Sequence, residues 1–267
     1  MTYQTLRNAG YTGDIFLIID NEDPTAAEYY ERYGDDKVVM FDKKAIGQTF
    51  DIADTRDDRR ATVYARNASF TIAKQLGLTY FMQLDDDYLD FEYRYNIRNE
   101  RLGVITVKSL DEVFAAMIRL LDDTKSLSVA MAQGGDFIGG VGNQSVRTPL
   151  LRKCMNSWLF RTDRPVKFIG RMNDDVNTYI MNGMRGGLFF TTTAVMLVAK
   201  PTQRSKGGMS EQYLDTGTYM KSFYTVMMCP SSVQVKFLHS KHKRLHHAVK
   251  WRNTVPKIID QRHRKKR

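Results

Sequence analysis

The sequence predicts an α/β fold with a mixed, mostly parallel sheet flanked by helices. Short apolar runs alternate with amphipathic segments along the first half of the chain. One run, residues 78–84, ends abruptly in Asp85, Asp86 and Asp87. Open α/β sheets keep their ligands at the carboxyl ends of their strands, so we expect a site at this triplet. With 267 residues, of which 42% are hydrophobic, the chain can bury a sizeable core.

The first elements predict a β-α-β unit. Residues 14–20 form an apolar run that ends beside an acidic cluster, and Pro24 fits the first turn of a helix over residues 25–33. Gly34 ends this helix, and residues 37–41 predict the second strand. Such a unit favours parallel strands joined by a right-handed crossover.

A long helix over residues 57–77 leads directly into the acid-tipped strand, residues 78–84. Three adjacent carboxylates repel one another, so we expect a cation to bind beside Asp85, Asp86 and Asp87. A hard metal ion that carries a phosphate is the obvious candidate.

The alternation of strands and helices continues to residue 132 and then ends. Residues 104–107 predict a strand, Ser109 caps a helix in a Ser-x-x-Glu arrangement, and residues 127–132 predict another strand. The five glycines of residues 133–142 must form a loop, but they match no Walker or dinucleotide-binding fingerprint. Close approach of the backbone to a ligand and simple flexibility both remain open for this loop.

A second acidic pair, Asp174 and Asp175, opens an apparent helix. An aspartate at this position can be only a helix cap, or it can serve as a catalytic base. The long irregular residues 201–230 suggest a lid or an acceptor-side loop. Further strands are expected over residues 187–191, 194–199 and 233–238.

The net charge of +10 is concentrated at the C-terminus. Residues 239–267 carry eleven Lys or Arg and one acid, whereas the rest of the chain carries 29 of each sign. All five histidines, His246 among them, lie in this segment. We therefore divide the chain into an α/β domain, residues 1–238, and a basic segment, residues 239–267, and expect a polyanionic partner such as nucleic acid. A solvated tail that aids solubility is the alternative.

Several classes of protein are disfavoured. No run of 18 apolar residues exists, so no membrane span is expected. Residues 1–14 lack the basic and then apolar pattern of a secretion signal, which favours a cytoplasmic protein. Cys154 and Cys229 are too few for a disulfide framework and lack metal-ligand spacing, so we expect two buried thiols.

Two acidic clusters on one sheet allow three interpretations. In the first, Asp85 and Asp87 hold Mg²⁺ or Mn²⁺ against a nucleotide diphosphate. Asp174 or Asp175 then deprotonates an acceptor hydroxyl. In the second, the acids form a two-metal nuclease or phosphatase site. In the third, the protein binds nucleic acid without catalysis, and its acids cap helices and pair with basic residues.

The residues also resemble a known enzyme fold. Residues 65–67 (Ala-Arg-Asn), followed by a helix and by a strand that ends in residues 83–87 (Gln-Leu-Asp-Asp-Asp), resemble the heart of a GT-A glycosyltransferase with its Asp-x-Asp motif. The strand that ends at Asp20 resembles the nucleotide-contacting strand of that fold. Residues 168–177 resemble the acceptor-side acidic segment of its inverting members. The resemblance implies a GT-A-like, Rossmann-like domain.

More narrowly, the chain resembles the TET-associated glycosyltransferases, which are encoded mainly by bacteriophages. The segments that carry this resemblance are residues 155–163, 207–215, 217–223 and 246–251. Members of that family are thought to attach sugars to hydroxymethylated pyrimidines in DNA. The resemblance implies a nucleotide sugar, expected to be a UDP-sugar, as donor and such DNA as acceptor. A GT-A transferase that acts on a polysaccharide or a protein is the alternative.

The resemblance also implies metal ligands. Asp87 is the expected direct ligand of Mn²⁺ or Mg²⁺, assisted by Asp85. One histidine of His246 and His247 is expected to complete the metal shell. A surface histidine in a segment that contacts phosphates is the competing interpretation of this pair.

The remaining roles concern the nucleotide and the acceptor. Asp20, Arg66 and Asp86 are expected at the nucleotide. Asp175, or failing it Asp174, is the expected general base of an inverting reaction. A base inside a duplex is hard to reach, so flipping of the target or action on single strands would be needed.

The N-terminus departs from the GT-A pattern. That fold opens with a strand that grips the nucleotide base, whereas residues 1–10 predict the helix that follows such a strand. We expect either a chain that starts late or a member that lacks the strand. Trp158, Tyr213 and Tyr219 are candidates for stacking on bases, with burial in the core as the favoured alternative for each.

Overall fold

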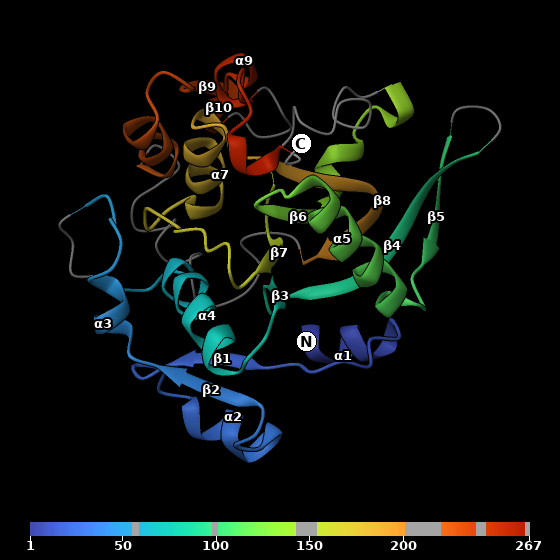
Figure 1. The fold of residues 1–267 in the computed structure, drawn as a ribbon, viewed down its shortest axis with the longest axis vertical. Coiled ribbons are helices and arrows are strands. Elements are labelled where there is room, and N and C mark those ends of the chain that lie inside the picture. The colour runs from blue at the N-terminus through green and yellow to red at the C-terminus, as the bar shows by residue number, and fades with distance from the viewer. Residues whose placement is uncertain (55–58, 98–100, 143–153, 201–219, 239–243, 265–267) are drawn as a thin grey trace.

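The computed structural model describes residues 1–54, 59–97, 101–142, 154–200, 220–238 and 244–264. Its centre is a six-stranded sheet with the strand order β3-β7-β6-β8-β4-β5. These strands are β3 (Tyr80–Leu84), β7 (Ser157–Arg161), β6 (Ser128–Gln133), β8 (Phe189–Ala199), β4 (Tyr88–Ile97) and β5 (Arg101–Thr106). Helices cover both faces of the sheet, which confirms the mixed α/β fold (Figure 1).

The central sheet is mostly antiparallel, so the expectation of a mostly parallel sheet is wrong. Of its five pairings, only that of β6 with β8 is parallel. The difference comes from β4 and β7, two strands that the apolar pattern did not predict. β4 pairs with β5 in a hairpin, and β7 lies antiparallel between β3 and β6. An antiparallel hairpin needs only a short connection, whereas a parallel pair needs a long crossover.

The N-terminal β-α-β unit is confirmed. β1 (Leu17–Asp20) and β2 (Val38–Phe41) pair in parallel and are joined by α2 (Ala26–Tyr33). They form a two-stranded sheet of their own. The next helices are α3 (Lys43–Gly47) and α4 (Val63–Gln75), which packs against both β1 and β2.

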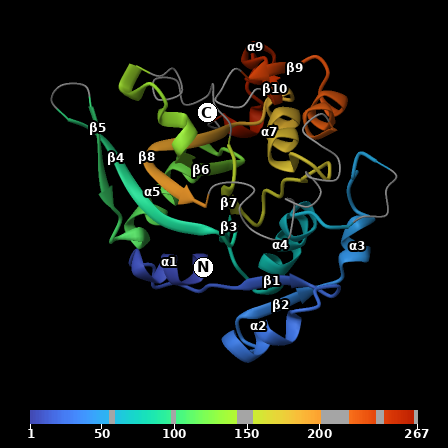
Figure 2. The same ribbon diagram turned by 180° about the vertical axis from the view of Figure 1, so that it is seen from behind.

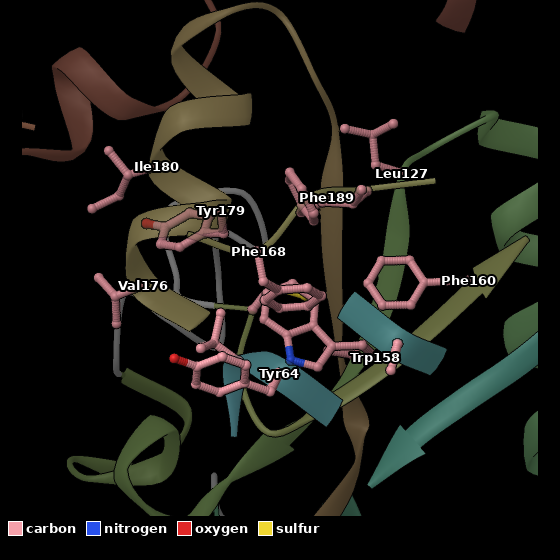
Figure 3. Close-up of a cluster of buried hydrophobic side chains, with 14 of the residues drawn as sticks. Tyr64, Leu127, Trp158, Phe160, Phe168, Val176, Tyr179, Ile180 and Phe189 are labelled. Atoms are coloured by element: carbon pink, nitrogen blue, oxygen red, sulfur yellow. The ribbon is translucent and has the colours of Figure 1, made fainter. Parts of the chain in front are cut away.

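Two apolar cores lie on the two faces of the central sheet. α4 and α7 (Asp174–Met184) cover one face, where Trp158, Phe160 and Phe168 pack against each other (Figure 3). α1 (Thr2–Asn8) and α5 (Leu110–Thr124) cover the other face. Side chains alternate along β7 between the two cores, as in a strand that is buried on both faces.

The structure describes only one of the three aromatic residues that were candidates for stacking on bases. Trp158 is completely buried, so its indole belongs to the core and is closed to a bound base. Tyr213 and Tyr219 lie outside the described residues. Cys154 and Cys229 are buried free thiols, as expected.

The C-terminal part packs at the end of the molecule opposite to β1, β2 and α2 (Figures 1 and 2). Residues 220–228 are helical. β9 (Val233–Leu238), β10 (Arg244–Val249), α9 (Trp251–Thr254) and the short helix η3 (Gln261–His263) follow. β9 and β10 form an antiparallel ribbon, so the predicted strand over residues 233–238 is confirmed. In the part of the chain that the structure describes, no helix is long and apolar enough to cross a bilayer.

Candidate active site

The acidic triplet, Asp85 to Asp87, forms the turn between β3 and β4. β3, β6 and β8 run in the same direction, so their carboxyl ends share one edge of the sheet. At this edge the N–H of Lys200, just after β8, donates to the carbonyl oxygen of Asp87 at 3.2 Å. Asp86 is exposed, and Asp85 and Asp87 are half-buried. The triplet is therefore presented at a strand end, as its position after an apolar run predicted.

Helix α1 fixes the backbone of this turn. Thr2 Oγ1 donates to Asp85 O at 2.7 Å and accepts from Tyr88 N at 3.0 Å. The Thr2 N–H donates to Asp86 O at 3.1 Å, and Thr5 Oγ1 donates to Tyr88 O at 2.9 Å. The buried Tyr88 hydroxyl accepts from Asp85 N at 3.2 Å. These contacts satisfy several polar backbone groups of the turn without using the carboxylates of Asp86 and Asp87.

The glycine-rich loop follows β6 at the same edge of the sheet. It contains two short 3-10 helices, η1 (Gly134–Phe137) and η2 (Gly140–Gly142). Gly139 and Gly140 have φ values of 92° and 65°, which glycine adopts without strain. An added Cβ at Gly134 or Gly135 would meet nothing within 4 Å, so packing against the described residues does not require glycine there. The loop thus presents bare backbone at this edge of the sheet, where it packs against β5, β6 and β8.

Arg66 joins the two acidic clusters. Its Nη1 lies 2.8 Å from Asp174 Oδ2, and its Nη2 lies 3.2 Å from Asp85 Oδ1. Arg66 is buried, with 8% of its surface exposed. Burial alone would lower the pKa of Arg66, but its attraction to Asp174 and then to Asp85 outweighs burial and raises that pKa. Arg66 was predicted to contact the nucleotide, and the structure places it within the site as the ion-pair partner of both acids.

Asp174 and Asp175 form the first turn of α7. Asn173 precedes them in the left-handed region, with φ 54°, and its Nδ2 donates to Thr225 Oγ1 at 3.0 Å. Asp174 is buried, whereas Asp175 is half-buried. Burial raises the pKa of Asp174 to about 6, against the opposing effect of Arg66. Asp175 is therefore the more accessible of the two carboxylates.

A second buried ion pair supports the segment that leads into Asp174. Arg171 is 2% exposed, and its Nη2 lies 2.5 Å from Asp54 Oδ2. The Tyr224 hydroxyl donates to the same oxygen. The Arg171 N–H donates to Ile52 O at 3.1 Å. These contacts tie the loop before α4 and the helical residues 220–228 to the start of α7.

The triplet carries more negative charge than its described neighbours neutralise. Within the described ranges, Asp85 pairs with Arg66, whereas Asp86 and Asp87 form no ion pair. Burial, followed by the charges of Asp85 and Asp86, raises the pKa of Asp87. A bound cation would relieve this repulsion.

The described part of the chain supplies only a portion of a metal shell. No three of its His, Cys, Asp or Glu side chains are grouped so that they could hold a metal ion. The structure therefore does not bring His246 together with Asp85 and Asp87. His246 lies on β10, opposite Lys236 in the ribbon.

Asp20 and Asp86 lie on the side of the site that faces the β-α-β unit. Asp20 is the last residue of β1, and its Oδ2 lies 3.0 Å from Lys43 Nζ. Tyr29, on α2, has its pKa raised by burial and then by the charges of Asp23 and Asp86. The unit that carries Asp20 therefore lies within electrostatic reach of the acidic turn.

Sequence reasoning missed the residues that support the site from a distance. Thr2 lies 83 residues from Asp85, and Arg171 lies 117 residues from Asp54. Neither pair has a local spacing signal in the chain. Only the fold brings these partners together.

Carboxylates from two segments meet at the edge of a mixed α/β sheet around one buried arginine, an arrangement suited to an enzyme that moves a charged leaving group. The model of the TET-Associated Glycosyltransferase family matches residues 1–208. The chain therefore belongs to the TET-associated glycosyltransferase family, and the family name identifies it as a glycosyltransferase. No curated protein and no solved structure matches the chain.

Proposed function

We propose that this glycosyltransferase moves a sugar from a nucleotide donor to the hydroxyl of a hydroxymethylpyrimidine in DNA. The observation that carries the proposal is the bridge made by Arg66. It joins Asp85 of the Asp-x-Asp motif to Asp174 of the acceptor-side segment. The acids assigned to the donor and those assigned to the acceptor thus share one site, as a GT-A-like transferase requires. Membership of the TET-associated family supports DNA as the acceptor.

The donor side of the proposal rests on the acidic triplet. Asp87, with assistance from Asp85, would hold Mg²⁺ or Mn²⁺, and the diphosphate of a UDP-sugar would complete the shell. Mg²⁺ is commonly held by one or two carboxylates together with substrate phosphates, which fits a site without a third protein ligand. When bound, the metal would neutralise charge on the departing diphosphate. Asp20 and Asp86 would flank the nucleotide.

The acceptor side rests on the first turn of α7. Asp175 would accept the proton of the hydroxymethyl group. The hydroxyl oxygen then bonds to the anomeric carbon, while the bond from that carbon to the diphosphate oxygen breaks and its electron pair leaves with the diphosphate. Attack opposite the leaving group inverts the configuration. Asp174 is the less available base because Arg66 holds its carboxylate.

The basic C-terminal segment would bind the DNA backbone. Lys236 and His246 are register partners on one face of the ribbon, so both can reach the same phosphate strand. We assign His246 to these phosphate contacts rather than to the metal shell. The target base would have to leave the duplex or be presented in a single strand.

Mass spectrometry of modified DNA tests the proposal. DNA that contains hydroxymethylcytosine or hydroxymethyluracil is incubated with the full chain, Mn²⁺ or Mg²⁺, and a panel of nucleotide sugars. We expect a sugar mass on the modified base, none on unmodified DNA, and none after chelation. Asp87→Asn and Asp175→Asn should abolish transfer. Asp163→Asn should not, because Asp163 follows β7 at the edge of the sheet away from the triplet. Transfer to a polysaccharide or protein alone would contradict the DNA acceptor.

A further inference from the structure

The β9–β10 ribbon exposes an aromatic side chain at its end. Every second side chain of β9 points to the same face, and on one face these are Val233, Val235 and Phe237. Val233 is 1% exposed and belongs to the core, whereas Phe237 is 65% exposed. Its register partner on this face is Leu245. No other aromatic side chain among the described residues is as exposed.

The stretch of sequence that contains Phe237 carries only positively charged side chains. Residues 216–259 contain eight Lys or Arg and no Asp or Glu. On the opposite face of the ribbon, Lys236 pairs in register with His246. The ribbon therefore combines cationic side chains on one face with an exposed aromatic side chain on the other. Nucleic acid offers the complement of both, because its phosphates attract cations and its bases stack on aromatic rings.

The position of the ribbon fixes which part of the DNA it can reach. The ribbon starts beside the C-terminal end of α7, where Ser232 Oγ lies 3.1 Å from Met184 Sδ. Asp174 and Asp175 lie at the other end of this 11-residue helix. A helix of that length spans about 16 Å, so the ribbon starts about five base pairs of duplex length from the acids. We therefore expect the ribbon to contact DNA beside the target nucleotide rather than at it.

We infer that Phe237 is a DNA wedge, which stacks on bases that flank the target while Lys236 contacts phosphates. Apolar side chains inserted at a base step unstack it and bend the duplex, which would help to expose the target. The inference rests on the proposed DNA acceptor. An anionic membrane also combines negative charge with an apolar interior, so vesicle binding is an outcome of the test.

The salt dependence of DNA binding separates the wedge from the phosphate contacts. The probes are duplexes without hydroxymethyl groups, each of which carries 2-aminopurine at one position, and these positions lie at increasing distances from the centre. Phe237→Ala should weaken binding by about 5- to 100-fold, leave the slope of log K against log salt unchanged, and remove the fluorescence gain of the unstacked 2-aminopurine. Lys236→Gln should instead reduce that slope by about 1.

Two further variants make the result decisive. Phe237→Tyr keeps an aromatic ring and should retain binding. Ile105→Ala removes a side chain that is 56% exposed on the distant strand β5 and should change nothing. Unchanged affinity of Phe237→Ala would overturn the wedge, as would a change only in oligomeric state or in binding to anionic vesicles. If the wild-type chain bound no DNA, the acceptor proposal itself would fail.

Discussion

Arg66 Nη1 lies 2.8 Å from Asp174 Oδ2, although 108 residues separate the two in sequence. Both residues are buried, at 8% and 5% exposure. The second guanidinium nitrogen of Arg66 pairs with Asp85, so a single cation balances acids from two segments. The arrangement holds the end of β3 and the start of α7 at a fixed separation. It also makes the charge balance of the site depend on one side chain.

Replacement of Arg66 should therefore be costly. Arg66→Met leaves Asp174 and Asp85 buried without their cation, and breaking a buried pair in this way costs about 3–5 kcal/mol. The double variant Arg66→Met with Asp174→Asn should recover part of that loss, since it removes the uncompensated charge. Urea unfolding without metal measures both. Arg262→Met breaks an exposed pair with Asp260 and should cost at most about 1 kcal/mol; equal losses for Arg66 and Arg262 would contradict the assignment.

The raised pKa of Asp174 predicts how stability varies with pH. Between about pH 4 and pH 6 the native state keeps a proton on Asp174 that the unfolded chain has lost. Stability from this group is thus complete below about pH 4 and falls as pH rises through about 6. Unfolding midpoints measured with chelator across this window should decline in the wild type. Asp174→Asn should flatten the decline, and an identical slope in both proteins would refute the role of Asp174.

The sequence contained enough local information to locate both acidic clusters. The apolar run before Asp85 predicts a buried strand, and the structure ends β3 at Leu84. Helix α7 begins at Asp174, as the second acidic pair indicated. The β-α-β unit could be predicted in the same way, because Pro24 and Gly34 mark the start and the end of its helix. Each of these signals lies within a few residues of the feature that it predicts.

The remaining features depend on distant partners. β4 opens with Tyr88 directly after the acids, without a turn signal, so the hairpin that makes the sheet mostly antiparallel was not predicted. Thr2 and Tyr224 touch the site across long sequence separations. A single sequence shows spacing along the chain but not which side chains meet after folding. The residues that support the site could therefore not be predicted from the sequence, whereas its acids could.

The contacts of Thr2 predict an effect on donor binding. Thr2→Val keeps the shape of the side chain but removes the hydroxyl that serves Asp85 O and Tyr88 N. We expect a loss of about 1–2 kcal/mol in unfolding free energy and weaker binding of the nucleotide with Mn²⁺, measured by calorimetry. Thr2→Ser should restore both. Thr12→Val removes an exposed hydrogen bond to Asp111 and serves as the control; normal donor binding by Thr2→Val would show that the turn does not need this support.

Tyr224 should affect turnover more than donor affinity. Its hydroxyl donates to Asp54, the partner of Arg171, so Tyr224→Phe loosens the segment that leads into Asp174 and Asp175 but leaves β3 untouched. We expect a lower kcat, an unchanged KM for the donor, and a stability loss of about 1 kcal/mol.

Tyr80→Phe is the matched control for this experiment. Its hydroxyl donates to Asp122 Oδ2 at 2.6 Å, at the end of β3 that lies away from the triplet. It should lower stability by a similar amount and leave kcat unchanged, because it removes a comparable hydrogen bond remote from the acids. Steady-state kinetics of both variants at saturating acceptor decide the question. An equal fall in kcat for Tyr224→Phe and Tyr80→Phe would mean that stability alone, and not the placement of Asp175, accounts for the effect.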